Sequence, residues 1–445
     1  MTATTTTTLE TSNANERGSV TGPGSRLHGA DGLRALAALG VLLHHMYQRL
    51  EVRDWSTGQW TQSDTVQNIH DLAIKGGYGV GVFFVLSGML LSYKFWMAYL
   101  TKTPYPRIAT YIRRRASRIV PGYYVALLVS FYFAAQWWQP RPGQENIPYE
   151  TERLISGLTF TNSFHVNTYF PVEANGPLWA IGMEVVSYVL MPLLMWGLYA
   201  MGKRGVIKAW GFWVGVVILA AIGQQLIIGH WDISGDWSHL IEGAKDWMPG
   251  RNPVGYFGQF ALGILASGAI VCWKVYAKGV RSWWFDVASV ALFSGVFWLL
   301  WSTRGAEKFG YDHDGSLALQ SALEFQEQPY LYPTFSIGVA LLAIALGFSK
   351  LTGRLMDNPF LTFIAKYSFG IYLWHMLIMD WWQRNIDPDY GYNGVSDVWR
   401  HFEINMTIFG LTLVFAIASF HLIEKHFLTG IFSGRKKREK VGASE

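Results

Sequence analysis

The chain contains few charged residues and a single cysteine. Only 15% of its 445 residues are Asp, Glu, Lys or Arg, whereas about 25% is usual in a soluble domain. The lone Cys272 excludes a disulfide framework, a thiolate cage for a metal and a redox cysteine pair. The sequence also lacks a metal-ligand cluster, a phosphate-binding glycine loop and the GxSxG turn of serine hydrolases. We therefore expect neither a metal cofactor nor an ordinary soluble fold.

Apolar residues are abundant and occur in long blocks. They make up 51% of the chain, and blocks of 17 to 25 residues are long enough to cross a bilayer as helices. Ten such segments lie at approximately 33–50, 78–100, 119–139, 176–201, 209–229, 253–273, 283–302, 333–349, 361–383 and 404–424. Many of the 21 Trp and 22 Tyr residues stand at their ends, where aromatic rings anchor helices among lipid headgroups. The sequence predicts an all-α, polytopic integral membrane bundle of about ten transmembrane helices.

Lysine and arginine residues are concentrated in alternate loops. They gather at 102–118, 203–208 and 274–281 and in the tail at 435–440, whereas the loops between are mixed or acidic. Short cytoplasmic loops are enriched in these residues, so we expect both termini to be cytoplasmic. Because membrane orientation explains the net charge of +5, we expect membrane lipids and no nucleic acid as partners.

The two ends of the chain differ from its apolar middle. Residues 1–30 are rich in Thr, Ser, Asn and Gly, which predicts a disordered cytoplasmic tail and not a signal peptide. Residues 31–427 are predicted to form one transmembrane domain. Residues 428–445 are predicted to be a basic cytoplasmic tail.

Five titratable side chains within the predicted spans stand out as candidates: His44, His45, Glu184, His375 and Glu424. A charged group at the centre of a span costs at least about 2.5 kcal/mol, so each of them marks a candidate functional position. Histidines that only hydrogen-bond to neighbouring helices are the simpler alternative.

The first span carries two polar groups on one face. His45 follows Arg34 by eleven residues, so both side chains leave the same face of a helix roughly 16 Å apart. His44 points about 100° away, so the two histidines are not expected to serve one site.

Two more titratable groups reach a depth similar to that of His45. Glu184 and His375 each lie about 12 Å from the outer end of their predicted spans. Ser87 stands midway along the second span, and Gly88 next to it allows a close approach of another helix or of a substrate. We expect these groups to converge on one pocket, although helix order around the bundle cannot be read from the sequence.

Two further patterns carry polar side chains on one helix face. Arg115 and Arg118 stand three residues apart and could hold a phosphate by forked hydrogen bonds. The positive-inside rule explains the same arginines without a ligand. Ser368, Tyr372 and His375 form a stripe at i, i+4 and i+7, which could serve a site or only join helices.

These residues fall within a set of motifs that resembles the membrane-bound acyltransferase family 3, from Asp31 to Phe427. The first span resembles its Arg-(ten residues)-His signature, which selects Arg34 and His45 and leaves His44 as a bystander. Five other segments resemble family motifs in the family's order: FFVLSGML with Ser87, RRRASRIVP with Arg115 and Arg118, LWAIGMEVV with Glu184, YSFGIYLWH with Tyr372 and His375, and SFHLIEKHF. Six motifs in order are far more specific than any one of them.

The chain departs from the family pattern at three places. Val185 stands where the family often has a second carboxylate, so no paired-carboxylate mechanism is expected there. His426 replaces the closing proline, which concerns only a helix end. Some members add a secreted hydrolase-like domain after the membrane part, and we expect the membrane domain of this chain to bind its acceptor without one.

The resemblance implies an integral membrane O-acyltransferase, by default of a bacterial plasma membrane. Such a protein moves an acyl group, usually acetyl, from acyl-coenzyme A to a hydroxyl of a sugar, envelope polymer, glycolipid or macrolide. Arg34, Arg115 and Arg118 would then bind the donor's phosphates on the cytoplasmic side. No metal is implied.

In this interpretation His45 is the general base on the acceptor hydroxyl. Glu184 would orient His45 or stabilise its imidazolium. Ser87, Tyr372 or His375 would position the acceptor or stabilise the oxyanion, and Ser87 as a covalent acyl carrier is the weaker option.

A proton-coupled transporter or flippase of a glycoconjugate is the competing class, since it too places His and Glu near the membrane midplane. The absence of an inverted repeat and of matching Gly/Pro-broken spans argues against it. Binding of coenzyme A would separate the two classes.

Overall fold

The computed structural model describes residues 27–54, 57–137, 149–165, 168–202, 205–229, 250–302 and 333–429. Within these ranges the chain is helical, and its β-pairing is limited to two isolated bridges. The long helices are α1 (Ala30–Tyr47), α3 (Gly79–Leu100), α4 (Ile108–Trp137), α6 (Trp179–Gly202), α7 (Val206–Gly229), α9 (Pro253–Tyr276), α10 (Trp283–Ser302), α12 (Thr334–Phe348), α14 (Pro359–Asn385) and α15 (Val398–Ser419).

Short helices connect or extend the long ones. They are α2 (Asp64–Ile74), η1 (Lys75–Tyr78), α5 (Tyr149–Leu158), η2 (Asn162–Phe164), η4 (Glu173–Leu178), α13 (Thr352–Met356), η5 (Phe420–Glu424) and α16 (Lys425–Thr429). The segment η5 is a π-helix at the end of α15, and η4 leads directly into α6.

The predicted all-α membrane fold is confirmed for the described part of the chain. Each of the ten predicted apolar segments falls on one of the long helices, and eight helices are long and apolar enough to cross a membrane. The other two segments are α1, which carries Asp31, Arg34 and two histidines, and α12, which has 15 residues. The protein is thus a multi-pass membrane protein, while the count of ten and the side of the termini stay predictions.

The predicted tails lie largely outside the described residues, which leave out 1–26 and 430–445. Leu27 is buried, and α1 begins at Ala30. The predicted outer loops at 230–252 and 303–332 lie outside as well, except for residues 250–252.

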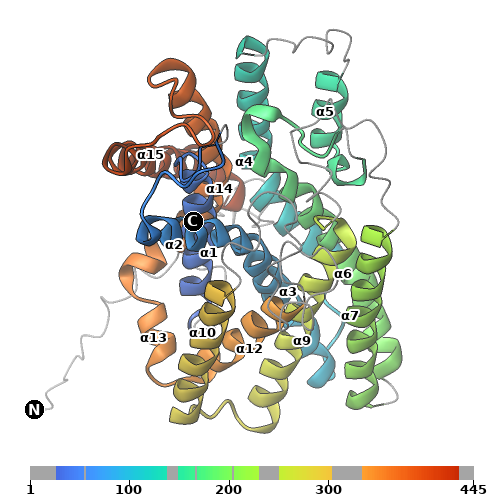
Figure 1. Ribbon diagram of the computed structural model, residues 1–445. Helices are drawn as coiled ribbons and strands as arrows, with labels where there is room; N and C mark the ends of the chain where they lie inside the picture. Colours follow the sequence, from blue (N-terminus) through green and yellow to red (C-terminus); the bar gives the residue numbers. More distant parts are fainter. Residues whose placement is uncertain are drawn as a thin grey trace, which may run out of the picture.

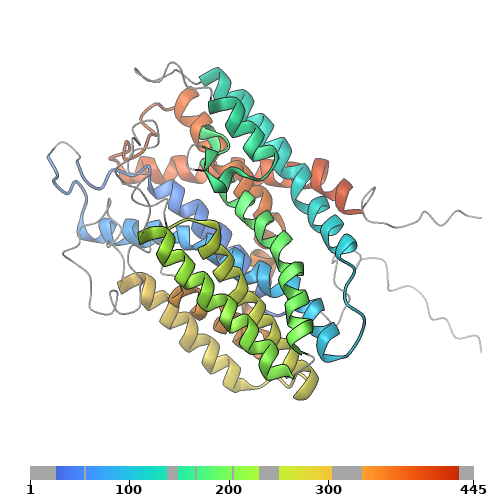
Figure 2. The same cartoon turned by 90° about the vertical axis from the view of Figure 1, so that its right-hand side faces the viewer.

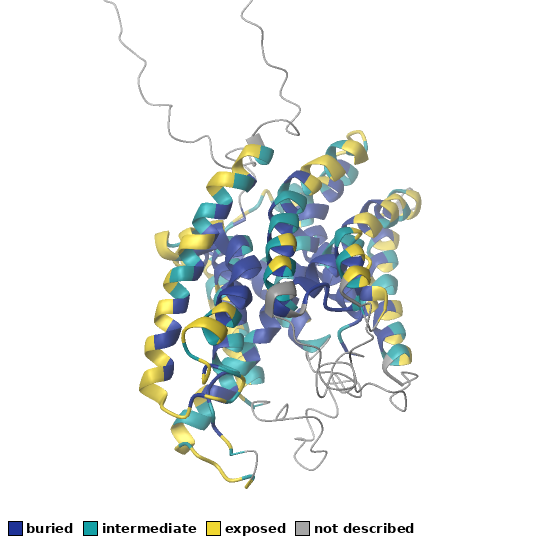
Figure 3. Cartoon of the chain, turned by 90° about the horizontal axis from the view of Figure 1, so that it is seen from above, coloured by how far each residue is buried: buried dark blue, intermediate teal, exposed yellow. Residues whose placement is uncertain are grey.

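Buried residues fill the middle of the bundle, and apolar residues cover its outside. Of the most apolar 18 residues of each span, 83% are buried in α9 but only 6% in α10. In Figure 3 the buried residues lie at the centre and the exposed ones on outward faces. Exposed side chains such as Leu219 on α7 and Trp298 on α10 are large and apolar, as a surface that faces lipid requires. Figure 2 shows α7, α9 and α10 running nearly parallel along one side.

Helices α3 and α9 pack against each other through the centre of the bundle (Figure 1). A Cβ added at Gly88 of α3 would overlap the carbonyl oxygen of Phe260, and one added at Gly263 of α9 would overlap that of Val85. Small residues let membrane helices approach to backbone contact, which provides packing that lipid cannot. The close approach expected at Gly88 is therefore present, and α9 is the helix that makes it.

Helix α1 is fixed at its first turn by a carboxylate from the segment before α14. The Asp357 side chain accepts hydrogen bonds from the backbone amides of Gly29 (2.9 Å) and Gly32 (3.4 Å). Amides in the first turn of a helix lack intrahelical partners, and a negative charge there is favourable. Farther along, α1 packs against α14, which in turn packs against α15. These contacts set the position of the polar residues on α1.

Replacing Gly88 by Leu should separate α3 from α9 and destabilise the fold, because the added side chain overlaps backbone on α9. We expect the apparent melting temperature in detergent to fall by roughly 5 °C or more, with loss of monodisperse protein. Gly211→Leu on α7 is the matched control, since a Cβ there meets no atom within 4 Å. Equal stability of the two variants would contradict the packing described.

Candidate active site

Two histidines from different helices face each other at the α1–α14 contact. The ring centroids of His45 on α1 and His375 on α14 are 5.1 Å apart, with 36° between the ring planes. His45 is half-buried, whereas His375 is 1% exposed. The sequence predicted that these side chains meet, and the helix packing brings them together.

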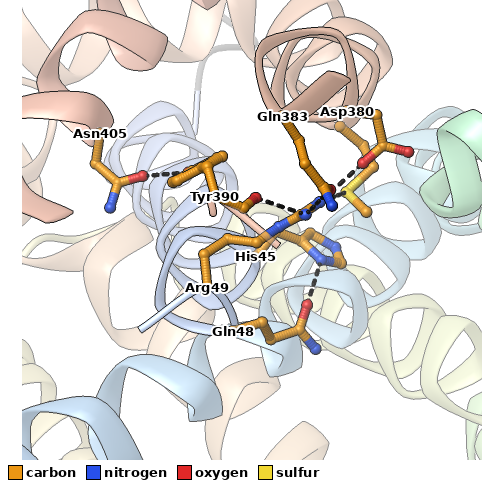
Figure 4. Close-up of polar contacts among 8 residues, drawn as sticks. His45, Gln48, Arg49, Asp380, Gln383, Tyr390 and Asn405 are labelled. Atoms are coloured by element: carbon orange, nitrogen blue, oxygen red, sulfur yellow. Dashed lines mark hydrogen bonds and ion pairs between the residues drawn. The ribbon is translucent and has the colours of Figure 1, made fainter. Parts of the chain in front are cut away.

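The ring of His45 is held by a side chain one turn farther along α1. Its Nδ1 lies 3.0 Å from Gln48 Oε1, and Gln48 Nε2 lies 3.3 Å from His44 Nε2. His44 Nδ1 in turn lies 2.5 Å from the carbonyl oxygen of Ile74 at the end of α2. His44 is therefore linked to His45 through Gln48. Figure 4 shows His45 with Gln48 beside it.

His375 is held by its own helix. Its Nδ1 lies 3.0 Å from the carbonyl oxygen of Ile371 and 2.9 Å from that of Tyr372, so this nitrogen carries the proton and donates. The Nε2 atom is then an acceptor, and it is buried without a hydrogen-bond partner among the described residues. A buried acceptor without a donor is costly, which marks this atom as a place for a ligand's hydroxyl or a water.

Tyr372 lies next to His375 and contacts the segment that precedes α6. Its ring centroid is 5.9 Å from that of His375, and its hydroxyl donates to the carbonyl oxygen of Pro177 at 2.5 Å. Asn175 of the same segment η4 donates to the carbonyl oxygen of Leu373 at 2.8 Å. The buried segment η4 thus closes against α14 beside the histidine pair. The stripe's third member, Ser368, donates to Ala365 of its own helix.

Glu184 is held by two hydroxyl groups. Ser87 on α3 donates to Glu184 Oε1 at 3.0 Å, and Tyr188 donates to the same oxygen from one turn farther along α6. The hydrogen bond that orients His45 comes from Gln48 and not from Glu184. A role for Glu184 toward His45 therefore stays a prediction.

The arginines predicted to bind phosphate share one region with Glu184. Arg34 on α1 interacts electrostatically with Arg118, Tyr188 and Glu184. Arg115 on α4 interacts with Arg118 and with the same Tyr188 and Glu184. Asp31 also interacts with Arg34, so the three guanidinium groups lie among carboxylates, and their forked donors are suited to a polyanion.

Glu424 lies near the same region, on the π-helix η5. It is buried, accepts a hydrogen bond from Ser419 at 3.4 Å and interacts electrostatically with Arg118. π-Helical turns are often found at functional sites, although this one also joins α15 to α16.

The contacts described above join the predicted site residues into two groups. An outer group contains His45, His375 and Tyr372, and an inner group contains Ser87, Glu184, Arg34, Arg115 and Arg118. Helix α1 contributes to both, because Arg34 and His45 are eleven residues, or about 16 Å, apart along it.

A buried ion pair braces the outer group. Arg49, fully buried, donates to Asp380 (2.8 Å) and to Gln383 (2.7 Å) on α14 and to the carbonyl oxygen of Tyr390 (3.1 Å). Figure 4 shows these contacts one turn from His45. Burial raises the pKa of Tyr390, so its phenol stays protonated and donates to Asn405 on α15 at 2.5 Å. The brace joins α1 to α14 beside the two histidines.

Sequence reasoning missed Gln48, Arg49 and Tyr188. All three are spaced from predicted site residues by one helical turn, at 45/48, 45/49 and 184/188. That spacing places them on the same helix face as a titratable group and is the signal that could have found them.

Comparison with known proteins supports the resemblance read from the motifs. A family model described as an acyltransferase domain, Acyl_transf_3, matches residues 27–423. A protein of Staphylococcus aureus strain COL named "Putative O-acetyltransferase SACOL0978" is 22% identical over 421 residues, which are 90% of this chain and 57% of that protein. The O-acetyltransferase OatA of S. aureus strain NCTC 8325 is 23% identical over 371 residues, which are 79% of this chain and 50% of OatA.

The chain thus spans little more than half the length of these curated relatives. No solved structure matches it. The family model, however, covers nearly the whole chain, including all ten long helices up to the π-helix. The predicted family is therefore confirmed: this chain belongs to the acyltransferase 3 family.

Proposed function

We propose that the protein is a membrane O-acyltransferase that moves an acyl group, acetyl in the first instance, from cytoplasmic acyl-coenzyme A to a hydroxyl of a sugar, glycolipid, envelope polysaccharide or macrolide. The observation that carries the proposal is the His45–His375 pair, of which His45 lies on the same helix as Arg34 of the inner group. A base and an anion site at different depths fit two substrates that meet inside the bundle.

The inner group would bind the donor. Arg34, Arg115 and Arg118 would hold the phosphates of coenzyme A by charge-assisted hydrogen bonds. With the thioester then extending along α1 toward His45, the donor would enter from the cytoplasmic side. Entry from that side requires the orientation predicted from the Lys and Arg distribution. In that orientation ten spans cross a bacterial plasma membrane and both termini lie in the cytoplasm.

The outer group would carry the chemistry. His45 Nε2 accepts the proton of the acceptor hydroxyl as its oxygen attacks the thioester carbonyl. The tetrahedral intermediate collapses, the C–S bond breaks, and the proton on His45 passes to the coenzyme A thiolate. Direct transfer of this kind needs no covalent acyl-enzyme on Ser87, whose hydroxyl donates to Glu184.

The partners of the outer group suggest their roles. His375 Nε2 would accept a hydrogen bond from the acceptor, since it has a lone pair and no described partner. The Tyr372 hydroxyl donates to Pro177 and would shape the acceptor pocket with segment η4. Glu184 would balance part of the arginine charge and orient Ser87 and Tyr188 in the donor site.

Replacing His45 by Ala should abolish acetyl transfer, because it removes the proposed general base. The measurement is transfer of label from radiolabelled acetyl-coenzyme A in membranes to envelope sugars, lipids or an added macrolide, at matched protein level. His426→Ala, at an exposed histidine in the first turn of α16, is the control and should retain wild-type activity. Residual transfer above a few per cent in His45→Ala would reject the base assignment.

The wild-type protein gives the test of the whole proposal. Consumption of acetyl-coenzyme A with label in an acceptor supports it. Intact protein that consumes no donor over several acceptors would instead favour the proton-coupled transporter or flippase.

Replacing Arg115 and Arg118 together by Gln should raise the apparent KM for acetyl-coenzyme A at least tenfold and change the acceptor KM little. The reason is that two charge-assisted contacts to phosphate would be lost, each worth about 1.5 to 3 kcal/mol. The double variant Arg113→Gln/Arg114→Gln removes equal charge from exposed positions of the same helix and is the control. An equal rise in both KM values would leave these arginines with an orienting role only.

A further inference from the structure

The hydrogen bonds that lead to His45 begin at the backbone carbonyl of Ile74, which can act only as an acceptor. The carbonyl oxygen of Ile74 can only accept, so His44 Nδ1, 2.5 Å away, must carry a proton and donate to it. In a neutral imidazole the other nitrogen is then an acceptor. His44 Nε2 therefore accepts from the Gln48 side-chain amide, whose Nε2 lies 3.3 Å away.

The same logic continues through Gln48 to His45. With its nitrogen turned to His44, the Gln48 amide presents Oε1 to His45 Nδ1 at 3.0 Å. An amide oxygen only accepts, so His45 Nδ1 must carry the proton. His45 Nε2 is then left with a free lone pair, and it has no hydrogen-bond partner among the described residues. The Ile74 carbonyl thus determines the tautomer of His45 through His44 and Gln48.

The opposite arrangement is costly. If the Gln48 amide were flipped, its oxygen would face His44 Nε2, and both nitrogens of His44 would have to carry protons. That cation would lie inside the bundle, where it interacts with the charges of Arg251 and with His375, and an unpaired charge in such a place is strongly disfavoured. The neutral hydrogen-bond chain Ile74–His44–Gln48–His45 gives a partner to both nitrogens of His44, to the Gln48 amide and to His45 Nδ1, and it needs no buried cation.

The helix packing explains how the Ile74 carbonyl reaches His44. A Cβ on Gly76 would overlap the carbonyl oxygen of Gly40, so η1 lies directly against α1. Gly77 lies next to His44, since a Cβ there would be 3.2 Å from the ring. The glycines after Ile74 thus allow a close contact of the two backbones, which brings the Ile74 carbonyl oxygen within hydrogen-bonding distance of His44.

We propose that Gln48 is a positioning residue that holds His45 as the Nδ1–H tautomer, with His44 and the Ile74 carbonyl fixing the orientation of the Gln48 amide. A neutral histidine side chain in water favours the Nε2–H form, which would put the proton on the nitrogen proposed as the base. The hydrogen bond at one ring nitrogen selects the proton's place on the other. The proposal rests on the proposed function in one respect only, that His45 Nε2 is the base.

The tautomer can be read without any assay of activity. Protein labelled with ¹³C and ¹⁵N in its histidines would be examined by NMR in detergent or lipid, with the His45 signals assigned by their loss in His45→Ala. We expect the wild type to show His45 protonated on Nδ1 and Gln48→Met to show a shift toward Nε2–H. A wild-type His45 protonated on Nε2 overturns the proposal.

Kinetics test whether the tautomer matters. Gln48→Met keeps the length of the side chain but cannot accept from His45 in the same way, so kcat should fall about 10- to 100-fold, with both KM values changed less than threefold. Gln48→Glu keeps an oxygen that accepts from His45 Nδ1, and it should lose less than tenfold. Gln67→Met on α2, where Gln67 donates to the Gln62 carbonyl, should match the wild type.

The two substitutions at Gln48 separate positioning from packing. A role in packing alone predicts that the apolar Met is tolerated better than the charged Glu, which is the reverse of our expectation. A kcat for Gln48→Met within twofold of the wild type, or equal losses in both variants, overturns the proposal.

A double-mutant cycle tests the link through His44. His44→Phe removes the group that orients the Gln48 amide, so kcat should fall by less than in Gln48→Met. The variant with both changes should be no slower than Gln48→Met alone, because both act through one hydrogen bond to His45. Additive losses of kcat would mean that His44 does not act through the hydrogen bond from Gln48 to His45.

The outcomes keep the two proposals apart. A wild-type protein that transfers no acetyl group contradicts the proposed function, while the NMR experiment still decides the tautomer. An active wild type with no response to Gln48→Met leaves the proposed function standing and rejects the role of Gln48.

Discussion

A polar side chain inside a membrane bundle must find its hydrogen-bond partners within the protein, and this constraint organises the site. Lipid offers no donor or acceptor, so each buried polar group is either paired or left at a cost. Both nitrogens of His44, the Gln48 amide and His45 Nδ1 meet this requirement together, with the Ile74 carbonyl as their last acceptor. His375 Nε2 and His45 Nε2 do not meet it within the described residues. An unmet acceptor distinguishes a ligand position from a structural histidine.

The same constraint separates charge along α1. The arginines gather near one end with Glu184 as a carboxylate partner, while the neutral histidines lie about three turns away. A neutral imidazole costs less to bury than a guanidinium, and its lone pair is what a base needs. In an acyl transfer this arrangement would hold the charged part of a donor away from the reacting carbonyl.

The sequence predicted the helices well because a bilayer imposes their length. Nine of the ten segments begin within about six residues of the observed helices, but α4 starts eleven residues before position 119. Its first turns carry Arg113, Arg114 and Arg115, and hydropathy reports where lipid begins, not where a helix does. The family was also readable, since six motifs stand in order.

The site was predicted only in part. The contact of His45 with His375 agrees with the similar depth expected for both. The place of Glu184 in the same pocket stays a prediction, and its partner Tyr188 was not foreseen. The depth of Glu184 was counted from residue 176, where the predicted span begins. In the structure α6 begins at Trp179, after the buried segment η4, in which Asn175 and Leu178 are 0% exposed. Gln48 and Arg49 stand at the very end of the predicted span 33–50, where polar residues are ordinary, so nothing in the composition singled them out.

Helix α1 is tied down near both ends by acidic residues that flank or belong to α14. Asp357 holds its first turn, and Asp380 holds Arg49 just beyond its last. A sliding of α1 along α14 would have to break both ties at once. The two histidines are therefore held as one unit, and their separation is set by the two helices together.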